Sequence, residues 1–273
     1  MGYEENNSSN FLFGIFLIGC STAKKDKSVS RSAMEGITKD SLSEDEEKFL
    51  EENSYYDGSQ KELLDNQKAW IYRYRYAMKT LETRYPSYDF EIVSGGDWSS
   101  PTDDNFSFKL KDETEDNLDT DYFTLYMEKD IKSSDDYIVE ENFYGYALRD
   151  LYESYMKDMF YGYGVIGVYC SMSTVSSELS EDSTVDDILN AGISPSTKLL
   201  VDIGECDYLE DIIKSYIVDD YRVSDNFCIV PIDGPSLFED LSSQEMYNKA
   251  RSLNYLDNEI SINSNKYRKE VMG

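Results

Sequence analysis

The sequence of 273 residues contains no histidine, and this absence excludes a wide range of chemistry. Without an imidazole, neither Ser-His-Asp nor Cys-His nucleophilic catalysis is available, and histidine-liganded zinc or iron is excluded as well. The four cysteines form no Cys-x-x-Cys pair, so no zinc or redox motif is indicated. The sequence also lacks a P-loop, a G-x-G-x-x-G run and a G-x-S-x-G elbow. We therefore predict no catalytic residue, no metal and no cofactor.

Positive charge is scarce, with 26 Lys and Arg against 55 Asp and Glu and a net charge of −29. Nucleic-acid binding depends on contacts between basic side chains and phosphates, so a surface this acidic predicts no nucleic-acid partner. The run Tyr72-Arg73-Tyr74-Arg75-Tyr76 does not alter this prediction. On a helix these five side chains point in different directions and do not form one aromatic and basic face.

Long hydrophobic runs are also missing. The apolar run 11–18 is too short to cross a bilayer, which needs about 20 residues, but it has the length of a secretory hydrophobic region. It leads into Leu17-Ile18-Gly19-Cys20 and then a polar stretch, a pattern that resembles the lipobox of bacterial membrane lipoproteins. The resemblance implies a signal peptide over residues 1–19, cleavage before Cys20 and a lipid such as palmitate on Cys20. Two acyl chains suffice for stable anchoring.

This resemblance implies that the protein lies at the cell membrane, lipid-anchored and facing outside the cytoplasm. One feature favours a different reading. Residues 1–10 carry Glu4 and Glu5 and no Lys or Arg, whereas the start of a secretory signal is positively charged. An acidic cytosolic protein with a signal-like N-terminus is therefore an alternative.

Residues 20–60 are expected to form a lipidated cysteine followed by a disordered acidic tether. The stretch is rich in Ser, becomes acidic at residues 41–47 and shows no sustained apolar period. The folded part is expected to consist of residues 61–160 and 161–273, two units that can form one domain. The 40% hydrophobic content argues against disorder of the whole chain.

The hydrophobic periodicity predicts an α+β fold. In residues 61–160 we expect an α-β-β-β-α unit with an antiparallel meander, built from helices at 61–85 and 140–160 and strands at 88–92, 106–110 and 123–127. In residues 161–273 we expect the order β-α-β-α-β-α-β and a mixed sheet. Its elements are expected at 165–170, 185–191, 198–203, 207–221, 227–232, 243–253 and 260–262.

Three motifs in the mature part resemble a known group of proteins. They are a long helix ending in Arg84-Tyr85-Pro86, the stretch Glu141-Asn142-Phe143-Tyr144 and the late strand Phe227-Cys228-Ile229-Val230-Pro231. In style they are similar to extracytoplasmic lipoproteins of Gram-positive anaerobes with no assigned function, over residues 61–262. The resemblance has no catalytic motif to carry over, so it supports the location and leaves the activity open.

One acidic stretch has a spacing close to that of a calcium loop. Asn117, Asp119, Asp121 and Glu128 occupy positions one, three, five and twelve of an EF-hand-like pattern, but Tyr122 stands where the turn requires glycine. We therefore predict a solvated acidic loop and no specific calcium site there.

The neighbouring residues in the sequence predict which cysteine and tyrosine side chains are buried. Cys170 and Cys228 lie in apolar runs that are typical of strands, which predicts buried free thiols and no disulfide. Among the 24 tyrosines, those on the expected helices mostly fall at core-facing spacing, so the core is their predicted place. The remaining candidates for surface aromatics that stack on sugars are Tyr55, Tyr56, Tyr72, Tyr76 and Tyr163.

These observations predict a lipid-anchored extracytoplasmic protein of a bacterial envelope. It is expected to act as a non-catalytic binding or interaction module with an unknown envelope or extracellular ligand, attached to the membrane through Cys20. The alternative in a different class is a carboxylate-based hydrolase that acts on envelope or dietary polymers. Acidic pairs abound in the sequence, but a glycosidase needs two carboxylates at a set separation across a sugar, which a sequence does not show.

Overall fold

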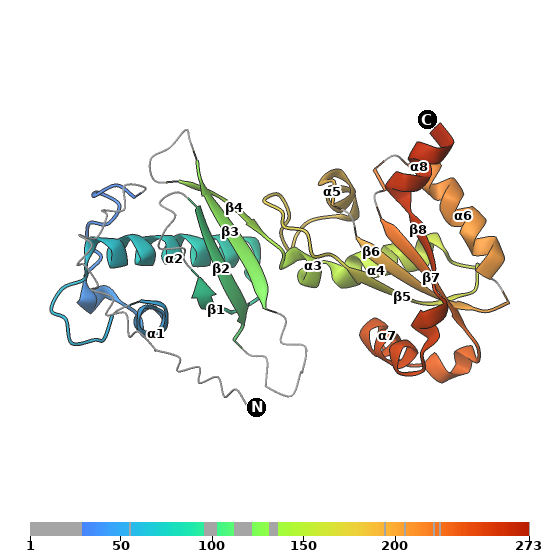
Figure 1. Ribbon diagram of the computed structural model, residues 1–273, viewed down its shortest axis with the longest axis horizontal. Helices are drawn as coiled ribbons and strands as arrows, with labels where there is room; N and C mark the ends of the chain where they lie inside the picture. The colour runs from blue at the N-terminus through green and yellow to red at the C-terminus, as the bar shows by residue number, and fades with distance from the viewer. Residues whose placement is uncertain are drawn as a thin grey trace, which may run out of the picture.

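The computed structural model describes residues 29–54, 56–95, 103–111, 122–130, 136–193, 195–204, 206–220, 222–223 and 225–272. Within these ranges the fold is α+β, with eight α-helices and two four-stranded sheets (Figure 1). The helices are α1 (Glu44–Asn53), α2 (Asp65–Arg84), α3 (Tyr144–Ala147), α4 (Arg149–Met159), α5 (Val185–Asn190), α6 (Cys206–Asp219), α7 (Ser243–Ser252) and α8 (Ser264–Met272). The strands are β1 (Phe90–Gly95), β2 (Asp103–Leu110), β3 (Phe123–Lys129), β4 (Tyr137–Glu141), β5 (Val165–Ser171), β6 (Ser196–Asp202), β7 (Asn226–Ile232) and β8 (Ile260–Asn263).

The first sheet is an antiparallel meander in the order β1-β2-β3-β4, which confirms the predicted meander of three strands and adds β4 to it. Alternate residues of each strand are buried, so the sheet has one apolar face. Helices α1 and α2 supply the apolar partner of that face, and Phe49 of α1 packs its ring against Trp70, Tyr74 and Phe106.

The second sheet is mixed, in the order β5-β6-β7-β8. Strands β6 and β7 are parallel because α6 returns the chain between them, whereas β5 and β8 run antiparallel to their neighbours. Both faces of this sheet are covered. Along β6, Leu199 and Val201 face the large core with α4 and α6, and Leu200 faces a smaller cluster with Phe238 and Ala250.

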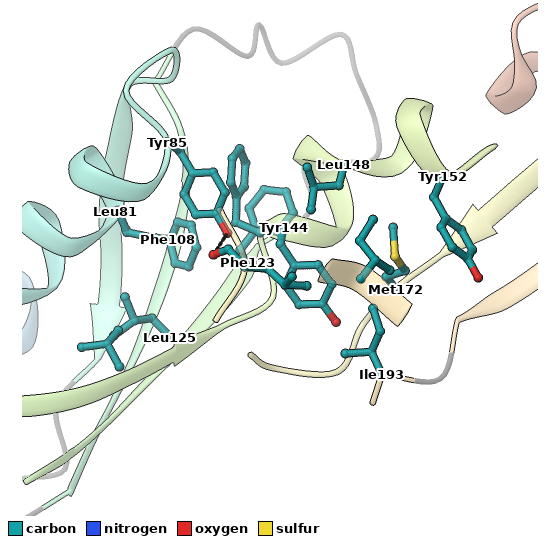
Figure 2. Close-up of a cluster of buried hydrophobic side chains, with 14 of the residues drawn as sticks. Leu81, Tyr85, Phe108, Phe123, Leu125, Tyr144, Leu148, Tyr152, Met172 and Ile193 are labelled. Carbon is teal, nitrogen blue, oxygen red and sulfur yellow. Dashed lines mark hydrogen bonds between the residues drawn. The ribbon is translucent and has the colours of Figure 1, made fainter. Parts of the chain in front are cut away.

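One continuous hydrophobic core joins the two sheets. Figure 2 shows how it passes from one sheet to the other across α3. Leu81, Tyr85, Phe108, Phe123 and Leu125 come from the first part of the chain, and Tyr144, Leu148, Tyr152, Met172 and Ile193 continue the cluster toward the second. The two sheets therefore lie at opposite ends of an elongated molecule and share their apolar packing (Figure 1).

The expected disordered tether over residues 20–60 is wrong for the described part of that segment. A 3-10 turn forms at Lys39–Ser41, and α1 follows with Phe49 and Leu50 buried. Ser43 caps α1, and its side chain and that of Glu46 form a reciprocal capping box. Tyr56 is buried as well, so ordered packing begins well before residue 61.

The structure differs from the expected order of elements at two other places. Residues 137–141 form β4, and a helical part starts only at Tyr144, so the helix expected over 140–160 begins too early. The alternation of Tyr137 and Val139 is too short to stand out beside the helical pattern that follows. The terminal helix α8 was not expected at all.

We predict that Phe49→Ala destabilises the full chain by about 3 to 5 kcal/mol, because Phe49 is only 2% exposed and its removal leaves a cavity among aromatic rings. Urea unfolding followed by circular dichroism measures the change. The control is Glu52→Ala on the exposed side of α1, with an expected effect within about 0.5 kcal/mol. Equal stability of the wild type and Phe49→Ala would contradict the packing of α1.

Candidate functional site

An open cleft of about 260 Å³ lies where the two halves of the chain meet. Three segments line it, namely the start of β3, the stretch through α3 to the first residue of α4, and the end of β5 with the residues after it. Its lining consists of Tyr122, Phe123, Asn142, Gly145, Tyr146, Arg149, Tyr169, Cys170, Ser171, Met172 and Ser173. No carboxylate is among these described residues.

The β5 side of the cleft follows the alternation of an extended chain. Cys170 and Met172 are buried, whereas Ser171 and Ser173 are exposed and Tyr169 is partly exposed. A ring of α7 supports this side, because Tyr247 stacks on Tyr169 with 4.1 Å between ring centroids and 6° between ring planes. Ser171 and Ser173 therefore contribute exposed hydroxyls to the lining of the cleft, beside a tyrosine ring that Tyr247 holds in place.

Gly145 determines how closely the two sides approach. A Cβ atom at this position would overlap the backbone carbonyl oxygen of Met172. Only glycine lets α3 pack directly on the chain that leaves β5. Tyr144 adds to this contact, because its hydroxyl donates to the Thr174 carbonyl at 2.7 Å. The cleft is thus bordered by backbone segments that are fixed against each other.

Arg149 is the cationic side chain of the cleft. Its guanidinium lies over the Tyr146 ring, 5.6 Å from the centroid, and donates to Gln244 of α7 at 3.4 Å. It forms no ion pair with any described residue within 4 Å, although the carboxylate of Glu153, one turn further along α4, attracts it. A partly buried arginine without an ion-pair partner is unusual in a chain with two acids for every base.

Asn142 is fixed by the backbone of β3. Its Oδ1 atom accepts from the Thr124 N–H at 2.8 Å, and its own N–H donates to the Thr124 carbonyl at 3.2 Å. The Nδ2 amide has no partner among the described residues and is left as a donor at the cleft. Arg149 and Asn142 therefore contribute hydrogen-bond donors to the same hollow.

Three carboxylates with raised pKa lie close to this region, and each is held inside the protein. Glu141 is fully buried and accepts from the Tyr85 hydroxyl at 2.6 Å, the Phe143 N–H at 2.5 Å and Arg84 at 3.3 Å. Burial raises its pKa above the ordinary value, and the Tyr85 hydroxyl and Arg84 oppose that shift.

Glu153 and Asp225 are the other two. Burial raises the pKa of Glu153, whose carboxylate accepts from the Cys170 N–H at 2.8 Å. Burial raises the pKa of Asp225 to about 6, opposed by hydrogen bonds from the Thr197 and Tyr152 hydroxyls at 2.7 and 2.8 Å. None of the three lines the cleft, so their perturbed pKa values belong to structural hydrogen-bond networks.

Both strand cysteines are buried free thiols, which confirms the prediction for Cys170 and Cys228. Burial raises the pKa of Cys170, and its sulfur lies 3.5 Å from the Thr197 hydroxyl. The thiolate is the reactive form, so Cys170 is held in its unreactive state although it borders the cleft.

Several positions from the sequence interpretation lie outside the described residues. These are Cys20 and the whole signal-like segment, the calcium-spaced Asn117, Asp119 and Asp121, and Tyr55. Tyr122 and Glu128 are described, and β3 starts directly after Tyr122. No group of three or more potential metal ligands occurs among the described side chains. Within the same ranges, every helix is too short or too polar to cross a bilayer.

The cleft tyrosines are not the ones that the sequence singles out. Tyr56 is buried, and Tyr72, Tyr76 and Tyr163 pack partly buried against the core. Tyr122, Tyr146 and Tyr169 line the cleft instead. The alternation of Tyr169, Ser171 and Ser173 along β5 and just past its end is the sequence signal that points to this side of the cleft.

Comparison of the chain with protein-family models, with curated proteins and with solved structures finds no match.

We predict that Asp225 makes the wild type less stable as the pH rises. Between pH 3.8 and about 6 the folded state binds more protons than the unfolded state, so its stability falls across this window. The pKa of Asp225 is raised by about two units, and each unit corresponds to 1.36 kcal/mol. Between pH 4 and 7 the free energy of unfolding of the wild type should therefore fall by on the order of 3 kcal/mol relative to that of Asp225→Asn. Urea unfolding of both proteins at several pH values measures this.

The control is Asp257→Asn, which removes the same charge from an exposed position. A constant stability difference between wild type and Asp225→Asn across this pH range would contradict the burial of an ionisable carboxylate.

Proposed function

We propose that the protein is a lipid-anchored extracytoplasmic binding module of a bacterial envelope, with its ligand site in the cleft between the two sheets. The observation that carries the proposal is the combination of Arg149, the free Asn142 amide, two exposed serines and three tyrosines around one hollow. Polar groups that converge in a pre-formed concave site are typical of ligand recognition. The envelope location rests on the lipobox resemblance at Cys20.

The composition of the cleft favours binding over turnover. Glycoside hydrolysis needs an acid and a second carboxylate on either side of the bond, and the described lining has no carboxylate. Ser171 and Ser173 have no base among the lining residues to activate them, and Cys170 is buried with a raised pKa. The cleft therefore supports a binding module better than a carboxylate-based hydrolase.

We expect Cys20 to carry the anchor. Expression of the full chain in a bacterial host with labelled palmitate should label the wild type, and Cys20→Ala should remain unlabelled because the acceptor thiol is gone. Cys228→Ala is the control, because Cys228 is a buried strand cysteine and its removal leaves the signal intact. Equal labelling of the wild type and Cys20→Ala, or labelling of neither, contradicts lipidation at this position.

We expect Ser173→Trp to abolish ligand binding, because the indole would fill the cleft from an exposed position. The full chain is screened against glycans, peptidoglycan fragments and peptides for both binding and product formation. Ser154→Trp on the exposed side of α4 is the control and should keep every ligand. A ligand that both variants bind equally would place the site elsewhere, and product formation would identify an enzyme.

A further inference from the structure

The chemistry of the cleft restricts the class of ligand, and this inference rests on the cleft being the binding site. Arg149 offers a guanidinium that is not neutralised by an ion pair with any described residue. A guanidinium recognises planar anions through parallel N–H donors. The position of Arg149 over the Tyr146 ring keeps it in place without consuming all of these donors.

The other polar groups of the cleft are suited to bind a ligand that carries hydroxyl groups, and less suited to bind an apolar ligand. Asn142 Nδ2 is free among the described residues, and Ser171 and Ser173 are exposed along the opposite wall. Tyr122 lines the cleft and is 61% exposed, so its ring is accessible to a ligand. Aromatic faces beside hydroxyl and amide groups match a hydroxylated ring, whose edges are polar and whose faces are apolar.

The charge of the whole chain limits the anion. A net charge of −29 repels anions, and the repulsion grows with the charge of the ligand. One arginine balances one negative charge, which favours a carboxylate over a doubly charged phosphate. The volume of about 260 Å³ lies just below the usual range of ligand pockets, so the cleft suits a ligand no larger than a single sugar unit.

We infer that the cleft binds an acidic sugar, with its carboxylate on Arg149 and its hydroxyls on Asn142, Ser171 and Ser173. The cleft is open, so the bound unit can belong to a longer chain that continues outside. Recognition by charge also distinguishes this ligand from the neutral sugar of the same shape.

The test uses the full-length protein in non-ionic detergent at low salt, with ligand-observed NMR titrations. The probes are D-glucuronate, its neutral counterpart D-glucose, N-acetylalanine as a carboxylate without a sugar ring, and glucose 6-phosphate. We expect D-glucuronate to bind about tenfold or more tightly than each of the others. Arg149→Gln should weaken D-glucuronate about tenfold or more, a change of about 1.4 kcal/mol.

Lys157→Gln removes the same charge from an exposed position on α4, away from the cleft, and should leave D-glucuronate binding unchanged. Circular dichroism melting of both variants verifies that they fold. Three results would overturn the inference: D-glucose binding as tightly as D-glucuronate, Arg149→Gln binding like wild type, or tighter binding of N-acetylalanine or glucose 6-phosphate.

The outcome is separable from that of the proposed function. If none of the four probes binds but the screen finds a ligand that Ser173→Trp abolishes, the acidic-sugar assignment is wrong and the binding module stands. If the screen also finds no ligand that depends on the cleft, both are wrong.

Discussion

The buried carboxylate of Glu141 is the interaction on which the arrangement of the two sheets depends. It ends β4, and it receives Tyr85 and Arg84 from the end of α2 and two backbone N–H groups at the start of α3. The Arg84 guanidinium also donates hydrogen bonds to the carbonyls of Val139 and Ser177, so it binds the chain that follows β5 as well. Removal of one of these partners would leave the buried carboxylate uncompensated at a cost of several kcal/mol, so the junction requires all of them together.

The cleft is a consequence of this junction. Asn142, Gly145 and Tyr146, which follow Glu141, line the cleft together with residues 169–173. The chain directly after Ser173 is held by Tyr144 at the Thr174 carbonyl and by Arg84 at the Ser177 carbonyl. Gly145 allows the two to touch. A site built on backbone contacts of this kind is largely formed before the ligand arrives, so binding does not require the walls to become ordered.

Local patterns in the sequence predict most elements of the fold, and contacts between distant residues account for what they miss. Alternation at Phe106, Phe108 and Leu110 is sufficient to place β2, and the Thr184 cap marks α5. Helix α1 is missed because its acidic face dominates, although Ser43 and Glu46 carry the capping-box signal. Glu141 is 56 positions from Tyr85 and 57 positions from Arg84 along the sequence, yet the three side chains meet at one junction. The cleft likewise brings together three separate segments. No periodicity within one element predicts either of them.

The early start of the fold changes where the protein can work. Ordered structure is described from residue 29, so a lipid on Cys20, as proposed, would be followed by only eight residues before it. A fully extended chain of nine residues reaches about 30 Å, which is less than one bilayer with its headgroups. The start of the described fold would then stay within that distance of the lipid, so the protein would meet its ligands close to the bilayer.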